Sequence, residues 1–422
     1  MGRNVVITGF GCLTAVGADA DATWEAILAG KTGIRHAADL GGSDSPYRLV
    51  AEIQDFNPRE LIDDRKLLKV ITRQDVIGLN AVSQAVEHSG IIEHRRSLAD
   101  PVSFDDRTGV FVGSPATKYR HQHDFLEPLV GTTGDVARFG RRAMENVHPM
   151  WLLRSLPNNV LAYAGIRYGF KGANENITAH GISGAQAIAE ACRYLRDGVI
   201  DRALVVAYDS ASEIEALAYY GSVGLLSSEG LRPFDQRRDG TVLGEGAGAL
   251  ILETQRAAES RGATVFGEVL GSSVTSEAVG VLAVREDGEG VSRAIRLALD
   301  DAGTAVGEVG MISAHANGSR VSDAGEARAF TEVFGDSTVP VTAFKWSTGH
   351  TIAASGVIET ILTLLCLKEG RVPGIATFEE LSSDCVGINV SAEEQQPTSA
   401  LGVVVTRGFA GLNSCIVLSV DG

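Results

Sequence analysis

Short runs of Val, Ile and Leu alternate with helical patterns along the chain, and this alternation constrains the fold more than any other sequence feature. Several runs are apolar at nearly every position, which is typical of strands covered on both faces. The pattern predicts an α/β fold with buried sheets and outer layers of helices. The expected strands are Asn4–Thr8, Gly109–Gly113, Ala203–Ala207, Ala247–Leu252, Val265–Leu270, Met311–Ala314, Val339–Ala343, Leu401–Thr406 and Ser414–Val420.

Two segments space their apolar residues three or four apart, as buried helices do. One follows Gly181 and is closed by Gly198, and the other follows His350 and is closed by Gly370. A charged helical stretch over 253–263 separates two pairs of expected strands. Because 422 residues exceed one ordinary domain of roughly 100–200 residues, we expect two halves, 1–255 and 256–422.

Composition narrows the classes of function. Hydrophobic residues make up 44% of the chain and charged residues 21%, as in an ordinary globular protein. A formal charge of −16 repels phosphate backbones, so we expect no nucleic-acid partner. No apolar run reaches the roughly 20 residues that span a bilayer, and the chain opens on a strand pattern rather than a signal peptide. Five scattered cysteines without a CxxC pair indicate reduced, mostly buried thiols and a cytoplasmic protein.

Polar residues of the C-terminal half suggest where chemistry takes place. One histidine ends an expected strand and another begins the second buried helix, and such positions allow two imidazoles to converge. Each histidine alone is more often structural than catalytic, but the two together, with a lysine nearby, indicate a site. The residues concerned are His315, with Asp323 and Glu326 after it, then Lys345, His350 and Glu359, and a Gly-rich turn over 406–413.

These features, in this order, resemble the β-ketoacyl synthases of fatty-acid and polyketide assembly. The stretches 5–11 and 232–248 also match signatures of that family, and the resemblance runs the whole length. It implies a thiolase-like five-layer α-β-α-β-α sandwich, built from two related halves and assembled as a dimer. The site residues it implies are the catalytic His315, His350 and Lys345, the supporting Glu359, Asp323 and Glu326, the gating Phe409, and Asn317 and Ser319 in place of two threonines that bind a phosphopantetheine arm.

The sequence departs from the family at the nucleophile. Family members carry a Cys at the start of the first buried helix, where the helix dipole favours the thiolate that attacks an acyl thioester. The flanking stretches 168–172 and 184–185 place Gly181 at that position, and glycine forms no thioester. His180 and Ile182 beside it also depart from the usual motif, so we interpret the loss as natural rather than engineered.

No other residue is expected to replace the missing thiol. Cys192 lies eleven residues further on, about 16 Å along a helix at ~1.5 Å per residue. Cys12, Cys366 and Cys415 lie in apolar patterns, where Cys is usually a small hydrophobic residue. Ser183 lacks an evident base. We therefore expect no acyl-transfer nucleophile.

A ketosynthase-like chain without its Cys resembles the chain-length factor, the non-elongating β-subunit of type II polyketide systems. The resemblance implies a heterodimer with a catalytic ketosynthase α-subunit, a phosphopantetheine-bearing acyl carrier protein as second partner, and no bound cofactor. In such a pair, the depth of the shared channel sets chain length. Residues after Gly113 are candidates for that channel, although ordinary core packing fits each one better: Phe125, Leu126, Phe139, Met144, Met150 and Trp151.

The retained His315 and His350 keep a second function open. Decarboxylation of malonyl carrier protein needs imidazoles that stabilise an enolate, and it does not need a thiol. Family members that act in this way usually carry Gln, not Gly, at the nucleophile position. In a third interpretation, both histidines persist as hydrogen-bonded core residues after activity was lost.

Two further observations concern the gate and metals. Ala410 stands where the family has a flexible Gly, and Arg407 stands where it has an apolar residue. A side chain at 410 restricts positive φ, which fits a gate that need not open. Metal ligation by the His121–Asp124 stretch, or by His180 together with the two site histidines, is the weaker interpretation, and we expect no metal site.

Overall fold

Eleven strands form one mixed sheet in the computed structural model, which describes residues 4–37, 47–115, 123–211, 213–335 and 338–420. A separate pair of short strands, β2 (Arg35–His36) and β3 (Leu49–Val50), lies outside it. The strands of the large sheet, in spatial order, are β11 (Asn389–Val390), β10 (Pro340–Thr342), β9 (Met311–Ser313), β12 (Leu401–Gly408), β13 (Leu412–Ser419), β8 (Gly267–Ser276), β1 (Val5–Thr14), β7 (Glu245–Thr254), β6 (Arg202–Ser210), β4 (Thr108–Gly113) and β5 (Asn174–Ile177).

The two halves of this sheet repeat one topology. In the first half, β1 is antiparallel to β7 and β7 to β6, whereas β6, β4 and β5 run parallel. In the second half, β8 is antiparallel to β13 and β13 to β12, whereas β12, β9 and β10 run parallel. β1 and β8 pair directly and join the halves into one sheet. The sheet is thus continuous across the two halves. The domain boundary predicted at residue 255 stays a prediction.

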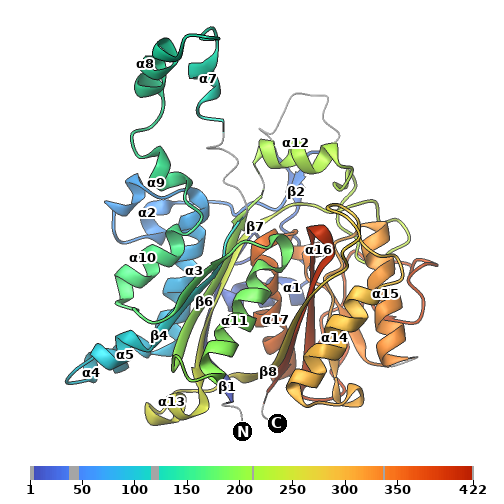
Figure 1. The fold of residues 1–422 in the computed structure, drawn as a ribbon. Helices are drawn as coiled ribbons and strands as arrows, with labels where there is room; N and C mark the ends of the chain where they lie inside the picture. The colour runs from blue at the N-terminus through green and yellow to red at the C-terminus, as the bar shows by residue number, and fades with distance from the viewer. Residues whose placement is uncertain (1–3, 38–46, 116–122, 212, 336–337, 421–422) are drawn as a thin grey trace.

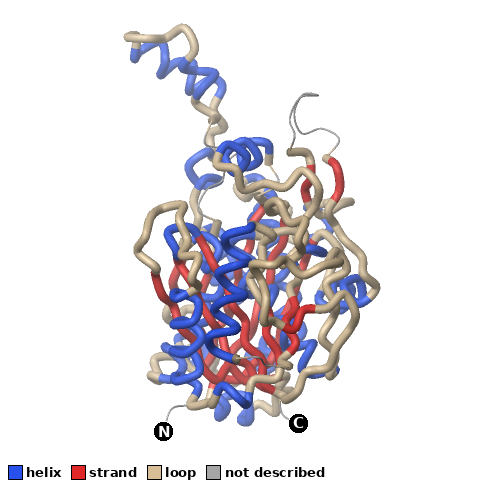
Figure 2. The backbone as a smooth tube through the Cα atoms, turned by 90° about the vertical axis from the view of Figure 1, so that its right-hand side faces the viewer, coloured by secondary structure: helices blue, strands red, loops and turns tan. Residues whose placement is uncertain are grey.

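Helices cover both halves of the sheet and fill the space between them (Figures 1 and 2). On one side α3 (Arg73–Ser89) packs on β1, β6 and β7, and on the other α14 (Glu289–Ala302) packs on β8 and β13, with α15 (Arg320–Phe334) beside it. Between the halves, α11 (Ser183–Arg196) contacts β4, β6, β8 and β13, and α17 (Ser355–Glu369) contacts β7 and β12. This is the predicted order of five layers.

The two central helices approach each other through glycines. A Cβ on Gly184 would meet the Ala353 carbonyl oxygen at 2.8 Å, and one on Gly356 would meet the Ala185 nitrogen at 2.7 Å. Side chains at either position would hold the helices apart, because packed interiors leave no space for an added carbon. The close approach sets the starts of α11 and α17 side by side, where the site residues gather.

Both central helices were predicted, as were nine strands of the sheet. α11 and α17 begin at Ser183 and Ser355, and Gly370 closes α17 in a left-handed conformation with φ 66°. The remaining described helices are α1 (Ala20–Leu28), α2 (Pro58–Leu61), α4 (Ile91–Ser97), α5 (Val102–Asp106), α7 (Leu126–Leu129), α8 (Val136–Asn146), α9 (Trp151–Ser155), α10 (Asn159–Tyr168), α12 (Ile214–Ser222), α13 (Gln255–Ser260) and α16 (Lys345–Thr348). Within the described ranges, no helix is long and apolar enough to cross a membrane.

The segment containing α7 and α8 stands away from the body of the molecule (Figures 1 and 2). The side chains of Leu126, Met144 and Met150 are 55%, 86% and 43% exposed, so the prediction that core packing fits them best is wrong. Phe125 packs edge-on against Trp151, with ring centroids 4.9 Å apart. The segment folds on itself and leaves Leu126 and Met144 exposed.

Candidate active site

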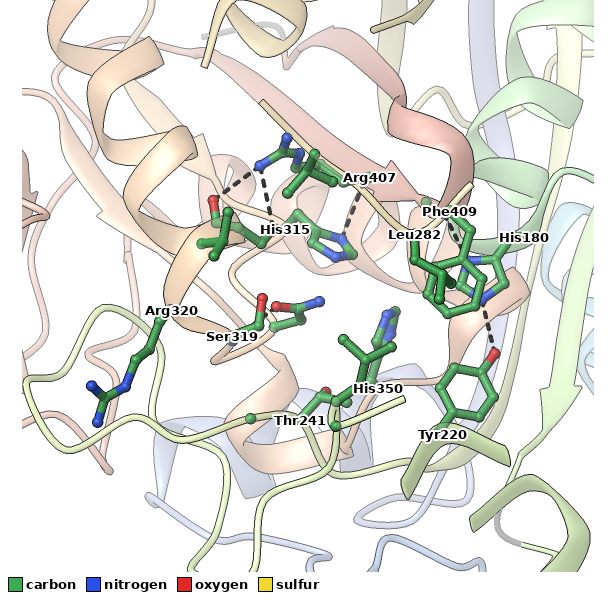
Figure 3. Close-up of a pocket in the computed structure, with 18 of the residues that line it drawn as sticks. His180, Tyr220, Thr241, Leu282, His315, Ser319, Arg320, His350, Arg407 and Phe409 are labelled. Carbon is green, nitrogen blue, oxygen red and sulfur yellow. Dashed lines mark hydrogen bonds between the residues drawn. The ribbon is translucent and has the colours of Figure 1, made fainter. Parts of the chain in front are cut away.

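A pocket of about 460 Å³ lies where the sheet ends meet the starts of the central helices. Figure 3 shows His315 and His350 in its middle, the exposed Arg320 at one side, and the rings of His180, Tyr220 and Phe409 at the other. The pocket volume falls in the range of roughly 300–1,000 Å³ that small-molecule sites occupy. Asn317, Ser319 and Thr241 add polar groups to its wall.

His315 is held from three directions. Glu326 accepts the backbone N–H groups of His315 and Ala316 at 2.8 and 2.7 Å, and the Lys345 ammonium donates to the His315 carbonyl at 2.6 Å. The Arg407 backbone N–H donates to the Nδ1 atom of His315 at 3.2 Å. Because Nδ1 accepts that bond, the neutral ring carries its proton on Nε2.

His350 is oriented in the same way. Its Nδ1 atom accepts the Ile352 backbone N–H at 3.3 Å and lies 3.2 Å from the Ser355 hydroxyl. Its proton is therefore also on Nε2. The two imidazole rings lie 5.1 Å apart at 79°. Burial, and next the Lys345 ammonium, lower the pKa of both histidines well below their usual value, so both are neutral. Two neutral N–H donors on the wall of one pocket can stabilise an oxygen that gains negative charge.

Lys345 and Glu359 form an ion pair behind the histidines. Both side chains are buried, and the ammonium is in hydrogen-bond contact with the Glu359 Oε1 atom. Burial raises the pKa of Glu359 to about 7, and the Lys345 charge opposes that rise. Neither residue lines the pocket. The pair therefore acts on the His315 backbone, and the catalytic role predicted for Lys345 stays a prediction.

Asp323 holds the loop that follows His315. Its carboxylate accepts the Phe234 and Gly318 backbone N–H groups at 2.9 and 3.2 Å, and burial raises its pKa to about 7. In the same loop, the Asn317 side-chain oxygen accepts the Ser319 backbone N–H at 3.0 Å. Asn317 and Ser319 both line the pocket, and their contact with a phosphopantetheine arm stays a prediction.

The structure leaves no space for a side chain at position 181. Gly181 lies in a 3-10 turn, His180–Ile182, directly before α11. A Cβ there would overlap the Arg407 carbonyl oxygen and would lie 3.4 Å from the Gly408 Cα atom. The backbone of the gate turn, residues 406–413, thus occupies the volume that a nucleophilic side chain would need.

Other potential nucleophiles are engaged or remote. The Ser183 hydroxyl accepts the Ala179 N–H and donates to the His180 carbonyl, each at 2.8 Å. All five cysteines are buried and unpaired, as predicted, and none lines the pocket. Burial raises the pKa of the Cys12 and Cys192 thiols to about 12, far from the thiolate that acyl transfer needs.

Sequence reasoning missed the contacts of His180. Its ring stacks on Phe409 with centroids 4.0 Å apart at 12°, its Nδ1 atom accepts the Phe409 N–H at 3.3 Å, and its Nε2 atom lies 2.8 Å from the Tyr220 hydroxyl. Both ring nitrogens are thus engaged. In the described part of the chain, no three His, Cys, Asp or Glu residues form a group that would hold a metal, and His121 lies outside the described residues. For the contacts of His180, the only sequence signal was the imidazole itself, at a position where the family has a small residue.

Sequence reasoning also missed Glu277, the buried partner of Arg407. The guanidinium donates to Glu277 at 2.8 Å and to the Ser322 carbonyl at 3.0 Å, and Asn413 accepts from its Nε atom at 3.0 Å. Arg407 and Glu277 side chains are 2% and 0% exposed. The sequence drew attention to Arg407, but nothing in it indicated a partner 130 residues away.

Comparison with known proteins places these features in a family. The β-ketoacyl synthase N-terminal domain matches residues 2–258, and its C-terminal domain matches residues 266–379. The chain belongs to the β-ketoacyl synthase family. The fold is accordingly thiolase-like, as predicted. A 3-oxoacyl-[acyl-carrier-protein] synthase 2 of Coxiella burnetii is 28% identical, over 99% of this chain and 98% of its own length.

Solved structures of this family share the whole fold. A β-ketoacyl synthase from Burkholderia phymatum superposes with a TM-score of 0.89 at 25% identity, over 100% of both chains. The ishigamide ketosynthase/chain length factor gives a TM-score of 0.89 at 26% identity, again over 100% of both. A ketosynthase in complex with its chain length factor from Xenorhabdus doucetiae gives 0.79 at 20% identity, over 99% of this chain and 98% of the other, and shows the fold alone.

Proposed function

We propose that this chain is a non-elongating ketosynthase-like subunit, a chain-length factor, that pairs with a catalytic ketosynthase. The observation that carries the proposal is at position 181, where glycine replaces a nucleophile and the Arg407 carbonyl takes the space of a side chain. Without a thioester on this subunit, chain extension takes place on the partner. The likeness to the ishigamide ketosynthase/chain length factor supports this assignment.

The projecting segment supplies a surface for the partner. Large apolar side chains are exposed on this segment and on α9, which follows it: Leu126, Leu129, Val130, Val136, Met144, Met150, Leu152 and Leu153. Several large exposed apolar side chains close together in the chain are typical of a protein–protein interface. A partner that covers it would place these side chains against the channel of the catalytic subunit. In this proposal, acyl carrier protein delivers the chain to the catalytic subunit, and the covered segment limits the length of the product.

Co-expression with a Cys-bearing ketosynthase tests this function. The two chains should co-purify in equal amounts, and the pair should elongate malonyl units whereas this chain alone should not. Substitution of the partner's nucleophilic Cys by Ala should abolish elongation, because this chain has glycine at the position of the family's nucleophile. A stable homodimer of this chain that ignores the ketosynthase, or elongation by this chain alone, would refute the proposal.

A second candidate function has its own observation. His315 and His350 present two neutral Nε2–H donors on the wall of the pocket. These donors fit the enolate oxygen that forms when malonyl thioester loses CO2, as the breaking C–C bond passes its electron pair to the thioester and the carbon then takes a proton from water. Incubation with malonyl carrier protein should then release CO2 and leave acetyl carrier protein. His315→Ala should abolish that release, and the absence of any release from the native chain would exclude this candidate.

A further inference from the structure

A second polar cavity lies at the end of the sheet away from the histidine pocket. Figure 1 shows α13 at that end, close to the N-terminus, and α12 at the other end. The walls of the cavity come from residues around the starts of β1, β4 and β6 and from α13, which follows β7. Its volume is about 710 Å³, within the range of roughly 300–1,000 Å³ that small-molecule sites occupy. We call it the α13 cavity.

A buried arginine without a full set of partners lines the α13 cavity. Arg202 is only 8% exposed, and its guanidinium carbon lies 4.5 Å from the centre of the Phe104 ring. Its Nε atom is 3.4 Å from a Glu253 oxygen, but it has no hydrogen-bond partner in the described part of the chain. A guanidinium carries five N–H donors, and buried donors are nearly always paired. Arg202 therefore presents donors that a ligand in this cavity could satisfy.

The nearest carboxylates are already taken by other arginines. The Nε atom of Arg261 lies 2.9 and 3.1 Å from the two oxygens of Glu253, so Arg202 shares this carboxylate as a distant second cation. Asp201 accepts from the Nη2 atom of Arg107 at 2.8 Å. Three guanidiniums thus share two carboxylates, and one positive charge is left without a counter-ion.

The remaining charged groups of the wall do not remove this excess. Arg256 on α13 is exposed and adds a positive charge. Glu259 adds a negative charge, and its carboxylate accepts the Gln255 side-chain amide at 2.8 Å. Four guanidiniums then stand against three carboxylates at this end of a chain whose formal charge is −16. The α13 cavity is therefore a local site for an anion on an acidic protein.

Phosphate is the anion that matches these donors best. Burial lowers the pKa of Arg202 and the Glu253 carboxylate opposes that change, but a guanidinium stays charged in a protein. The planar fork of a guanidinium fits two phosphate oxygens at once, in strong charge-assisted hydrogen bonds. A phosphate group alone would leave most of the 710 Å³ empty, so the cavity also has space for an organic group attached to it.

We propose that the α13 cavity binds a phosphate group, either free or at the end of a small phosphate ester. Arg202 is the buried donor, and Arg256 adds a second cation at the exposed part of the wall. This site goes beyond the function proposed above and does not depend on it, because the histidine pocket and Gly181 lie at the other end of the sheet.

Calorimetry at low ionic strength tests the proposal on the full-length chain, with inorganic phosphate and adenosine monophosphate as separate probes. The native chain should bind at least one probe with a Kd below about 1 mM, and Arg202→Met should weaken that binding at least about tenfold. Arg202→Met should fold, because methionine keeps an apolar stem against Phe104 and Glu253 keeps Arg261. Arg371→Met, which removes a surface arginine paired with Glu394, is the matched control and should bind like the native chain.

The two probes distinguish the sources of the phosphate. Tighter binding of adenosine monophosphate supports a phosphate ester as ligand, and tighter binding of inorganic phosphate supports the free ion. Arg256→Glu provides a second route if Arg202→Met does not fold, because it reverses an exposed charge of the wall and should also weaken binding at least about tenfold. No binding of either probe to the native chain, or unchanged binding in these variants, would overturn the inference and leave the proposed function intact.

Discussion

At the scale of single residues, the proposed function depends on Gly181. Introducing the family's thiol should not restore acyl transfer, because a Cβ at 181 overlaps the Arg407 carbonyl oxygen. We expect Gly181→Cys to lower the free energy of unfolding by about 1–3 kcal/mol, the usual cost of overpacking. Chemical denaturation measures that loss. Gly307→Ala is the matched control, since nothing lies within 4 Å of a Cβ there, and it should change stability by less than ~0.5 kcal/mol. A Gly181→Cys variant as stable as the native chain would contradict the observed packing.

His180 should make stability depend on pH. Its pKa in the folded chain is lowered to about 4 from 6.5, so between these values the unfolded chain binds more protons. Stability from this residue is thus fully present above pH 6.5 and is lost as pH falls toward 4. The stability difference between the native chain and His180→Gln, measured by urea denaturation across this range, should shrink as pH falls. A difference that stays constant with pH would show that His180 titrates normally.

At the scale of elements, the gate turn depends on a buried ion pair. Arg407→Met should cost about 3–5 kcal/mol, because Glu277 remains buried without its cation. Adding Glu277→Met should recover a large part of that loss, since the second change removes the stranded charge. Thermal and urea unfolding of the single and double variants test this. Arg371→Met breaks a surface pair with Glu394 and should have a small effect by comparison. Equal losses in Arg407→Met and Arg371→Met would contradict the anchoring role.

Sequence patterns predicted the elements whose residues are apolar on a regular period. The strands β6, β7 and β12 are buried along almost their whole length, and α17 is apolar on nearly every face. The edge strands β5 and β11 were missed, because Asn174–Ile177 and Asn389–Val390 are short and polar and pair on only one side. Periodicity reports burial, and these edges have little of it.

The site was predictable only where its residues lie in local sequence motifs. His315, His350 and Lys345 were found from sequence motifs, and the structure brings them together. The stack on His180 and the pair between Arg407 and Glu277 depend on contacts across 229 and 130 residues. No local pattern encodes such pairings. The burial of Met144 was mispredicted because the sequence alone does not distinguish an apolar side chain in the core from one on the surface.

At the scale of the whole molecule, the projecting segment should control assembly. Val136→Asp with Met144→Glu places charges on side chains that are 81% and 86% exposed, so the chain's own stability should change by less than ~0.5 kcal/mol. Association with a catalytic ketosynthase, measured by sedimentation or surface binding, should weaken at least about tenfold. Val386→Asp, at a site 64% exposed on the body, is the control and should leave association unchanged. Equal association of both variants would exclude this segment as the interface.

The central claim, that this polypeptide carries no acyl group, is tested most directly by intact-mass spectrometry. The chain and a co-expressed ketosynthase would be incubated together with an acyl-loaded carrier protein, so that the partner reports that the donor is active. The partner should gain the mass of the acyl group while this chain keeps its unmodified mass. An acyl adduct on this chain, at any residue, would contradict the account.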